Sequence, residues 1–282
     1  MMGDIPESVV RDIVARALAE DIGPGDITTA ATVAPDADCR AEIVAKAEGV
    51  IAGLGIARLV FGMLDPQIAF HEVVADGGRV SEGMTVARLS GNTRALLAAE
   101  RTALNFLQRM SGIASLTAEY VEAVEGTDAR IIDTRKTAPG LRLLDKYAVR
   151  MGGGRNHRIG LFDGVLIKDN HLRAAGGVGE AVRRARKAAH HLVKVEVEVQ
   201  TLEEVEEAVA AGADVILLDN MELDDVRRAV DLVSGRGTIE VSGGVTLETV
   251  RALAESGVDY ISAGALTHSA PALDLSLEVA DD

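Results

Sequence analysis

The sequence predicts an α/β protein in which an N-terminal α+β domain precedes a barrel of parallel strands. From about Arg130 onward, short apolar runs alternate with amphipathic stretches. Before that point, the apolar residues recur at every second position over two segments. A long helical pattern from Glu100 to Glu125 lies between the two regions. Strands that alternate with helices are typical of βα units, which form a parallel sheet with right-handed crossovers.

In the first hundred residues, the pattern favours half-buried antiparallel strands. Arg40 to Glu48 and Gln67 to Ala75 alternate apolar and polar residues, and Gly55 to Leu64 is expected to form a short helix between them. Gly78 to Val86 is rich in turn residues and is similar to the hairpin of biotinyl carrier domains. No lysine for modification lies between Lys46 and Lys136, so we interpret this motif as a hairpin only.

The second region contains six short apolar runs that we predict to be strands. They are Ile131–Ile132, Val165–Ile167, Val193–Val199, Val215–Leu218, Ile239–Val241 and Tyr260–Ile261. Amphipathic helices are predicted at Val178–His190, Leu202–Ala211, Asp224–Val233 and Leu247–Ser256. Six or seven βα units favour a TIM-type barrel, complete or incomplete, with a doubly wound open sheet as the alternative.

Composition excludes several classes of partner. The 282 residues carry a formal net charge of −15 and are 48% hydrophobic but only 2% aromatic. An acidic chain with few aromatic rings is not expected to bind nucleic acid or an anionic membrane. The lone Cys39 excludes an internal disulfide and fits a reducing cytosol, and Met1 to Arg11 has no secretory pattern. We therefore expect a cytoplasmic protein.

One segment has the opposite charge. Between Arg130 and Arg173 there are ten Lys or Arg residues and four Asp residues, a local balance of +6. Arg135, Lys136 and Lys168 each follow an apolar β-branched run, so they stand where strands end. Because the carboxyl ends of parallel strands meet on one face of a barrel, we expect an anion site there.

Acidic and glycine-rich segments occupy the other strand ends. Glu196 and Glu198 lie within one apolar run, and Asp219 ends the next. Buried carboxylates need a partner or a metal ion, which favours Mg²⁺ held together with phosphate, or hydrogen bonds to sugar hydroxyls. Ser242-Gly-Gly244 and Ala263-Gly-Ala265 follow the last two runs, and such turns bind phosphate through free backbone N–H groups.

These motifs, in this order, resemble the quinolinate phosphoribosyltransferase family over nearly the whole chain. The matching segments are Ala19–Thr29, Glu100–Gln108, Asp133–Arg142, Gly152–Arg158, Lys168–His171, Leu217–Asn220, Ser242–Gly244 and Gly264–Ser269. The resemblance implies an N-terminal sandwich domain, residues 1–112, and an open seven-stranded α/β barrel, residues 113–269. It also implies a tail, residues 270–282, that returns to the first domain.

The resemblance implies the decarboxylating transfer of a phosphoribosyl group to quinolinate in NAD biosynthesis, with Mg²⁺. It assigns catalysis to Lys136, Lys168, Glu198 and Asp219, the last two also as metal ligands. It implies a homodimer in which Arg101 reaches into the partner's active site, with higher assembly left open. The implied substrate-binding residues are Arg101, Thr134, Arg135, Lys136, His157, Arg158, Lys168, Glu198, Asp219, Ser242, Gly243, Gly244, Ala263, Gly264, Ala265 and His268.

Three other functions are weighed against this one. A paralogue associated with molybdenum transport shares many of these motifs. A Schiff-base aldolase would use Lys136 or Lys168, and a phosphate-binding barrel would have no catalytic role. The full basic set favours quinolinate as the substrate. One departure from the family is Gln200, where many members carry Asp.

Overall fold

The computed structural model describes residues 5–280. Residues 1–4, the start of the segment Met1 to Arg11 in which no secretory pattern is found, lie outside the described residues. The chain forms two compact units. The first contains the chain up to Ala118, Ala138–Gly153 and the segment from Ser269, whereas the second contains Glu119–Thr137 and Gly154–His268. Helix α5 (Arg142–Met151) lies within the first unit.

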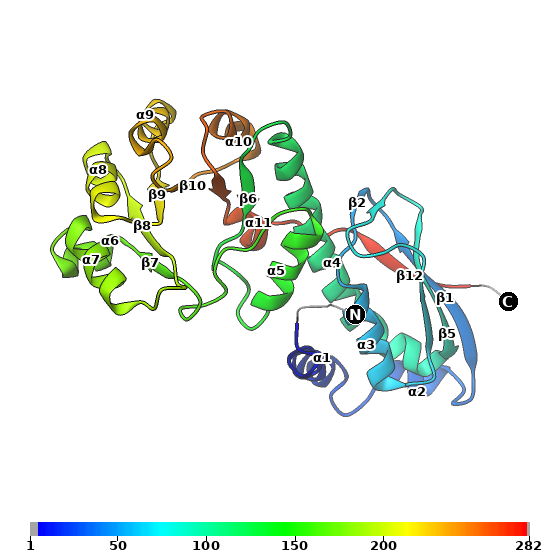
Figure 1. Ribbon diagram of the computed structural model, residues 1–282. Helices are drawn as coiled ribbons and strands as arrows, with labels where there is room; N and C mark the ends of the chain where they lie inside the picture. Colours follow the sequence, from blue (N-terminus) through cyan, green and yellow to red (C-terminus); the bar gives the residue numbers. More distant parts are fainter. Residues whose placement is uncertain (1–4, 281–282) are drawn as a thin grey trace. The chain divides into compact units, whose positions relative to one another are not determined.

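The first unit is built on an antiparallel sheet with the strand order β12-β1-β5-β3. Its strands are β1 (Asp38–Ala45), β3 (Ala69–Glu72), β5 (Thr85–Asn92) and β12 (Leu275–Val279). The C-terminal segment returns to this unit, where β12 lies beside β1 with Leu277 opposite Ile43 (Figure 1).

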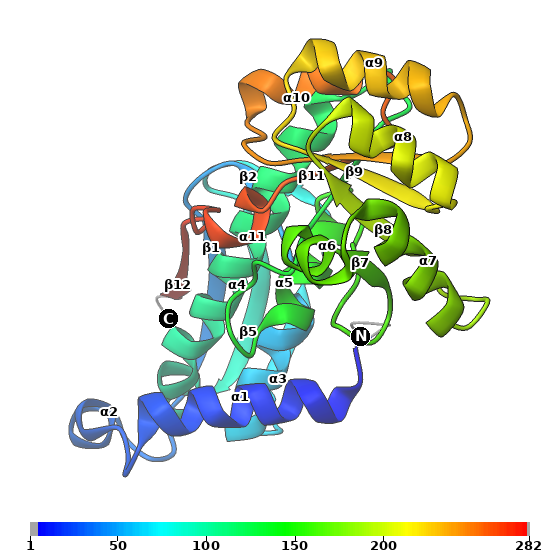
Figure 2. The ribbon, with the colours of Figure 1, turned by 90° about the vertical axis from the view of Figure 1, so that its left-hand side faces the viewer.

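The remaining elements of the first unit are mostly helical. They are α1 (Glu7–Ile22), α2 (Ile27–Thr32), α3 (Leu54–Leu64), α4 (Thr93–Ala123), and the strands β2 (Gly49–Val50) and β4 (Arg79–Val80). Helix α1 packs beside α3 (Figure 2). The carboxylate of Asp26 accepts the backbone N–H of Thr29 and so caps α2. The hairpin predicted at Gly78–Val86 is wrong, because β4 pairs with β2, which lies far from it in sequence.

The second unit contains a parallel sheet with the strand order β6-β11-β10-β9-β8-β7. Its strands are β6 (Arg130–Ile132), β7 (Val165–Ile167), β8 (Val195–Val199), β9 (Val215–Asp219), β10 (Thr238–Ser242) and β11 (Tyr260–Ser262). All six apolar runs that were predicted as strands form them. Within residues 5–280 the sheet has six strands, and a seventh segment contributes a single parallel bridge between Arg155 and Ile132 at β6.

Helices connect these strands, and α7, α8 and α9 lie along the outer side of the sheet (Figure 1). The helices of this unit are α6 (Asp169–Ala175), α7 (Val178–Ala188), α8 (Leu202–Ala211), α9 (Leu223–Val233), α10 (Leu247–Ala254) and α11 (Ala265–His268). Thr201 caps α8 by accepting the N–H of Glu204, and Gly212 ends it in a left-handed conformation. These local signals account for the close agreement between the predicted and observed bounds of α8.

Strand β8 places its charged residues on the side opposite its valines. Val195, Val197 and Val199 are buried, and the intervening Glu196 and Glu198 share the other face because side chains alternate along a strand. That face is the inner side of the barrel, where the site described next is found. In the part of the chain described, no helix is both long and apolar enough to cross a membrane.

Candidate active site

A cavity of about 340 Å³ lies at the carboxyl ends of the strands in the second unit. This is the face at which α/β barrels carry their active sites. The cavity is lined by Thr134, Arg135, Lys136, His157, Arg158, Leu166, Lys168, Glu198, Leu217, Asp219, Asn220, Glu240, Ser242, Gly243, Gly244 and Ser262.

The basic side of the cavity comes from three segments that are far apart in sequence. Lys168 directly follows β7 and forms an ion pair with Glu198 of β8, with 2.5 Å between Nζ and Oε2. Arg158 donates to the carbonyl oxygen of Gly164 at 3.0 Å. Burial lowers the pKa of Arg158, and the nearby charge of Arg135 lowers it further. Two guanidinium groups held close together in a half-buried site favour the binding of an anion.

The acidic side is formed by Glu198 and Asp219, from neighbouring strands. Asp219 accepts a hydrogen bond from the side-chain amide of Gln200 at 3.2 Å. Gln200 therefore contacts one of the two acids. Both carboxylates line the cavity together with the basic residues.

The turn after β10 provides the glycine-rich wall. Gly243 has φ +90°, and an added Cβ would lie 2.3 Å from Oδ1 of Asn220. Asn220 itself has φ +53°, and its backbone N–H donates to the carbonyl oxygen of Ser242 at 2.9 Å. Position 243 therefore favours glycine, because its φ is left-handed and the Asn220 side chain occupies the space that a Cβ would need.

The second predicted turn, Ala263–Ala265, follows β11 but does not line the cavity. It borders Lys136 instead. A Cβ added at Gly264 would lie 3.0 Å from Cδ of Lys136 and 3.1 Å from Nε2 of His268. The hydroxyl of Thr267 donates to the Lys136 carbonyl oxygen at 2.8 Å. This turn therefore fixes the segment that carries Lys136.

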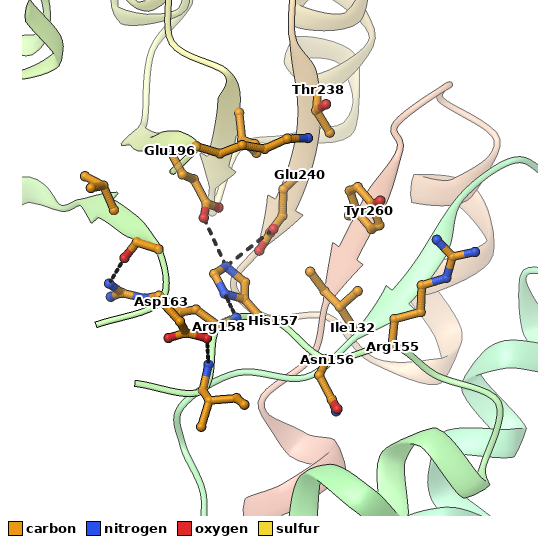
Figure 3. Close-up of a pocket in the computed structure, with 15 residues that line it drawn as sticks. Ile132, Arg155, Asn156, His157, Arg158, Asp163, Glu196, Thr238, Glu240 and Tyr260 are labelled. Atoms are coloured by element: carbon orange, nitrogen blue, oxygen red, sulfur yellow. Dashed lines mark hydrogen bonds and ion pairs between the residues drawn. The ribbon is translucent and has the colours of Figure 1, made fainter. Parts of the chain in front are cut away.

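Three polar residues lie together beneath the cavity, and two of them, His157 and Glu240, line it. His157 lies between Glu196 of β8 and Glu240 of β10 (Figure 3). Its Nε2 atom is 3.1 Å from Oε2 of Glu196 and 3.7 Å from Oε2 of Glu240. Its Nδ1 atom accepts the backbone N–H of Arg158. An Nδ1 that accepts a hydrogen bond carries no proton, so the ring proton lies on Nε2 and points to the glutamates.

Asp133 fixes the loop that carries His157. Its carboxylate is fully buried and accepts the backbone N–H of His157 at 2.9 Å and the side-chain amide of Asn156 at 2.6 Å. Together with the bridge between Ile132 and Arg155, these bonds tie the loop to the end of β6.

The structure brings most of the predicted site residues together. Thr134, Arg135, Lys136, His157, Arg158, Lys168, Glu198, Asp219, Ser242, Gly243 and Gly244 line the cavity. Ala263, Gly264, Ala265 and His268 belong to the same unit but do not line it. Arg101 lies on α4 in the other unit, and its side chain is 58% exposed.

Sequence reasoning missed the roles of Glu240, Asp133 and Asn220. Glu240 had a detectable signal, since it is an acidic residue inside the apolar run Ile239–Val241, as Glu196 and Glu198 are inside theirs. Asp133 begins the motif Asp133–Arg142, and the motif alone indicates no role for it. Asn220 is signalled only by its left-handed backbone, which the sequence does not reveal.

A second cavity, of about 510 Å³, lies on the other side of His157, Glu196 and Glu240. Its lining includes the first residues of four strands, Val165, Val215, Thr238 and Tyr260, so it lies at the amino ends of the sheet. His157, Arg158 and Glu240 line both cavities.

Fold and site together define an α/β-barrel protein with a cavity of basic, acidic and glycine-rich walls at the carboxyl ends of its strands. Comparison with known proteins gives the family. Residues 26–111 match the N-terminal domain of quinolinate phosphoribosyl transferase, and residues 113–278 match its C-terminal domain. The chain therefore belongs to the quinolinate phosphoribosyltransferase family.

Individual relatives are similar along most of their length. A probable nicotinate-nucleotide pyrophosphorylase (carboxylating) of Bacillus subtilis is 49% identical, over 92% of this chain and 90% of that protein. A mitochondrial quinolinate phosphoribosyltransferase (decarboxylating) of Nicotiana tabacum is 44% identical, over 97% of this chain and 83% of that protein. The solved structure of the nicotinate-nucleotide pyrophosphorylase from Francisella tularensis has a TM-score of 0.93 and 42% identity, over 99% of each chain.

Proposed function

We propose that the protein transfers the phosphoribosyl group of phosphoribosyl pyrophosphate to quinolinate with loss of CO₂. The products are nicotinate mononucleotide, pyrophosphate and CO₂, and the reaction belongs to NAD biosynthesis. The observation that carries this proposal is the single cavity in which Arg135, Arg158 and Lys168 face an acid pair and a glycine turn.

The basic side suits quinolinate, a pyridine ring with two adjacent carboxylates. Guanidinium groups bind carboxylates through paired hydrogen bonds, and Arg135 and Arg158 offer two of them within one cavity. Lys168 adds a third cation, which the carboxylate of Glu198 holds in place. We propose that these residues orient the ring so that its nitrogen faces the anomeric carbon of the second substrate.

The glycine turn suits the 5′-phosphate of that substrate. Ser242, Gly243 and Gly244 precede α10, whose first backbone N–H groups favour an anion. A cavity of about 340 Å³ is within the size range of small-molecule sites.

The donor set at Glu198 and Asp219 fits Mg²⁺, which commonly binds one or two carboxylates together with substrate phosphates. We propose these two residues as its protein ligands. When bound, the ion would neutralise charge on the pyrophosphate that departs. The residues of the chain then orient the two substrates and stabilise charge at the anomeric carbon, and no covalent nucleophile is required.

Decarboxylation is proposed to follow the transfer. Once the ring nitrogen bears the ribose it is cationic, and it stabilises the carbanion that CO₂ leaves at C2. CO₂ released from quinolinate at a comparable rate without phosphoribosyl pyrophosphate would exclude this order.

Two further features are proposed for the protein as a whole. Arg101 is proposed to complete the active site of a partner subunit in a homodimer, since its exposed guanidinium does not line the cavity described here. A cytosolic location is proposed from the single cysteine, which is free.

The test is turnover of quinolinate with phosphoribosyl pyrophosphate and Mg²⁺, with nicotinic acid run in parallel. We expect nicotinate mononucleotide from quinolinate only. No product from either substrate, with a folded protein confirmed by circular dichroism, would contradict the proposal and favour the paralogue. Covalent trapping of Lys136 or Lys168 by borohydride with a carbonyl substrate would favour the aldolase.

A further inference from the structure

Glu240 is a buried acid at the floor of the active-site cavity, and the proposed binding roles leave it unused. It is 3% exposed. In the sheet it pairs with Leu217 of β9, which in turn pairs with Glu198 of β8. Glu240 therefore lies level with Glu198, which is proposed to lie beside the substrates. Both residues line the same cavity.

Side chains from β8, β9, β11 and the loop after Asp133 surround Glu240. Glu196 faces it from β8, His157 and Arg158 from the loop after Asp133, and Tyr260 and Ser262 from β11, whereas β9 contributes Leu217. His157 directs its Nε2 proton at the two carboxylates and so has no lone pair there for a metal ion. The three residues are thus better suited to hold a proton than a cation.

That proton has a defined place. Within residues 5–280, Oε1 of Glu240 and Oε1 of Glu196 are both buried and have no hydrogen-bond partner. Burial raises the pKa of Glu240 to about 8, and the neighbouring charge of Glu196 acts in the same direction. At neutral pH, Glu240 therefore carries a proton at the floor of the cavity.

The proposed reaction needs one proton at C2 of the ring, and this inference rests on that proposed function. We propose that Glu240 is the acid that protonates C2 of the pyridine ring after CO₂ has left. The bond between C2 and its carboxylate breaks, the electron pair stays on C2, and CO₂ departs. The O–H bond of Glu240 then breaks, and its proton forms the C2–H bond of nicotinate mononucleotide.

The second cavity gives Glu240 a route back to its acid form. Glu240 ends the step as a carboxylate, and it lines the cavity of about 510 Å³ at the amino ends of the strands. Water in that cavity returns the proton while substrates or products still occupy the active site. A residue that borders both cavities can exchange protons on one side and react on the other.

The test compares wild-type enzyme with Glu240→Gln, which keeps the size of the side chain and removes its proton. The matched control is Glu206→Gln, an exposed glutamate on α8. Pyrophosphate, CO₂ from the labelled 2-carboxylate, and nicotinate mononucleotide are followed in single turnovers and in the steady state. General acids commonly contribute about 100- to 10,000-fold to a rate.

For Glu240→Gln we expect release of pyrophosphate in the first turnover at a nearly normal rate. CO₂ release and kcat should fall about 100-fold or more, with the KM values little changed. CO₂ departure slows because it is reversible until the carbanion is protonated. A kcat within about twofold of wild type would assign the proton to another group, and raised KM values with an unchanged kcat would indicate a structural role.

The pH dependence of the unaltered enzyme is a second test, which holds even if Glu240→Gln fails to fold. The active form has Glu240 protonated, so CO₂ release in a single turnover should decline as the pH rises through its pKa of about 8. A rate that stays flat from pH 6 to about pH 10 would overturn the proposal. Absence of any product from the wild type would instead overturn the proposed function and this inference together.

Discussion

At the scale of single residues, Lys168 illustrates how the site combines charge with exposure. It directly follows β7, and its ammonium group is paired with Glu198, yet 48% of its side chain is exposed. An ion pair that faces a cavity contributes little to folding, because water screens it. The attraction between Lys168 and an anion becomes stronger when a dianionic substrate displaces the water. Lys168 is therefore expected to matter for substrate binding and not for stability.

Replacing Lys168 with alanine should lower kcat/KM for quinolinate by about 10- to 100-fold, the usual cost of one lost hydrogen bond to a charged group. Arg135→Ala should have a similar effect. The melting temperature should change little for Lys168→Ala, and Lys187→Ala, an exposed lysine on α7, is the control. Normal turnover in either active-site variant would contradict the assignment.

At the scale of elements, the turn between β10 and α10 depends on the neighbouring strand. Ser242 and Asp219 pair across β10 and β9, and Asn220 then closes on the turn from the end of β9. The glycine at 243 is required both by its backbone angle and by this approach. The shape of the proposed phosphate cradle is thus set by the contact of two βα turns, not by one turn alone.

For Gly243→Ala, we expect a large rise in the KM for phosphoribosyl pyrophosphate, because the new methyl group would displace Asn220. The strain amounts to about 1–3 kcal/mol. Gly235→Ala is the matched control, since Gly235 also has a positive φ of +74° but no atom within 4 Å of an added Cβ. An equal effect of both substitutions on KM would show that backbone strain, and not the cradle, is responsible.

Over the whole molecule, the residues proposed for the active site come from both units. The cavity lies within the second unit, whereas Arg101 is carried by α4 in the first. Arg109 lies about two helical turns further along α4. It has a structural role instead, because it pairs with the buried Asp145 of α5 at 2.9 Å. The exposure of Arg101 is consistent with a role outside its own unit, as the proposed homodimer requires.

Mixing two variants of low activity tests this arrangement. Arg101→Ala and Lys168→Ala should each have low activity alone, but mixed dimers contain one site with neither substitution. After subunit exchange, we expect about a quarter of wild-type activity, because half of the dimers are mixed and half of their sites are intact. No recovery, with exchange verified by a labelled subunit, would mean that Arg101 acts in its own chain or not at all.

The order of elements and the residues at the strand ends can be predicted from the amino-acid pattern alone. Alternating periodicities separate the antiparallel region from the βα units, and capping residues set the bounds of helices such as α8. Polar residues after apolar runs converge in any parallel sheet, so Arg135, Lys168, Glu198 and Asp219 could be placed in one cavity without coordinates. These features depend on local pattern and on a general rule of topology.

The residues beneath that cavity are brought together only when the chain folds. Glu196 and Glu240 belong to strands separated by β9, and the barrel's curvature brings both to His157. The resemblance assigns His157 to substrate binding, and the folded chain also engages its ring nitrogens with the glutamates and the backbone of Arg158. Contacts of this kind depend on strand order, curvature and side-chain direction together. A sequence specifies that combination physically, but no short segment of it shows the result.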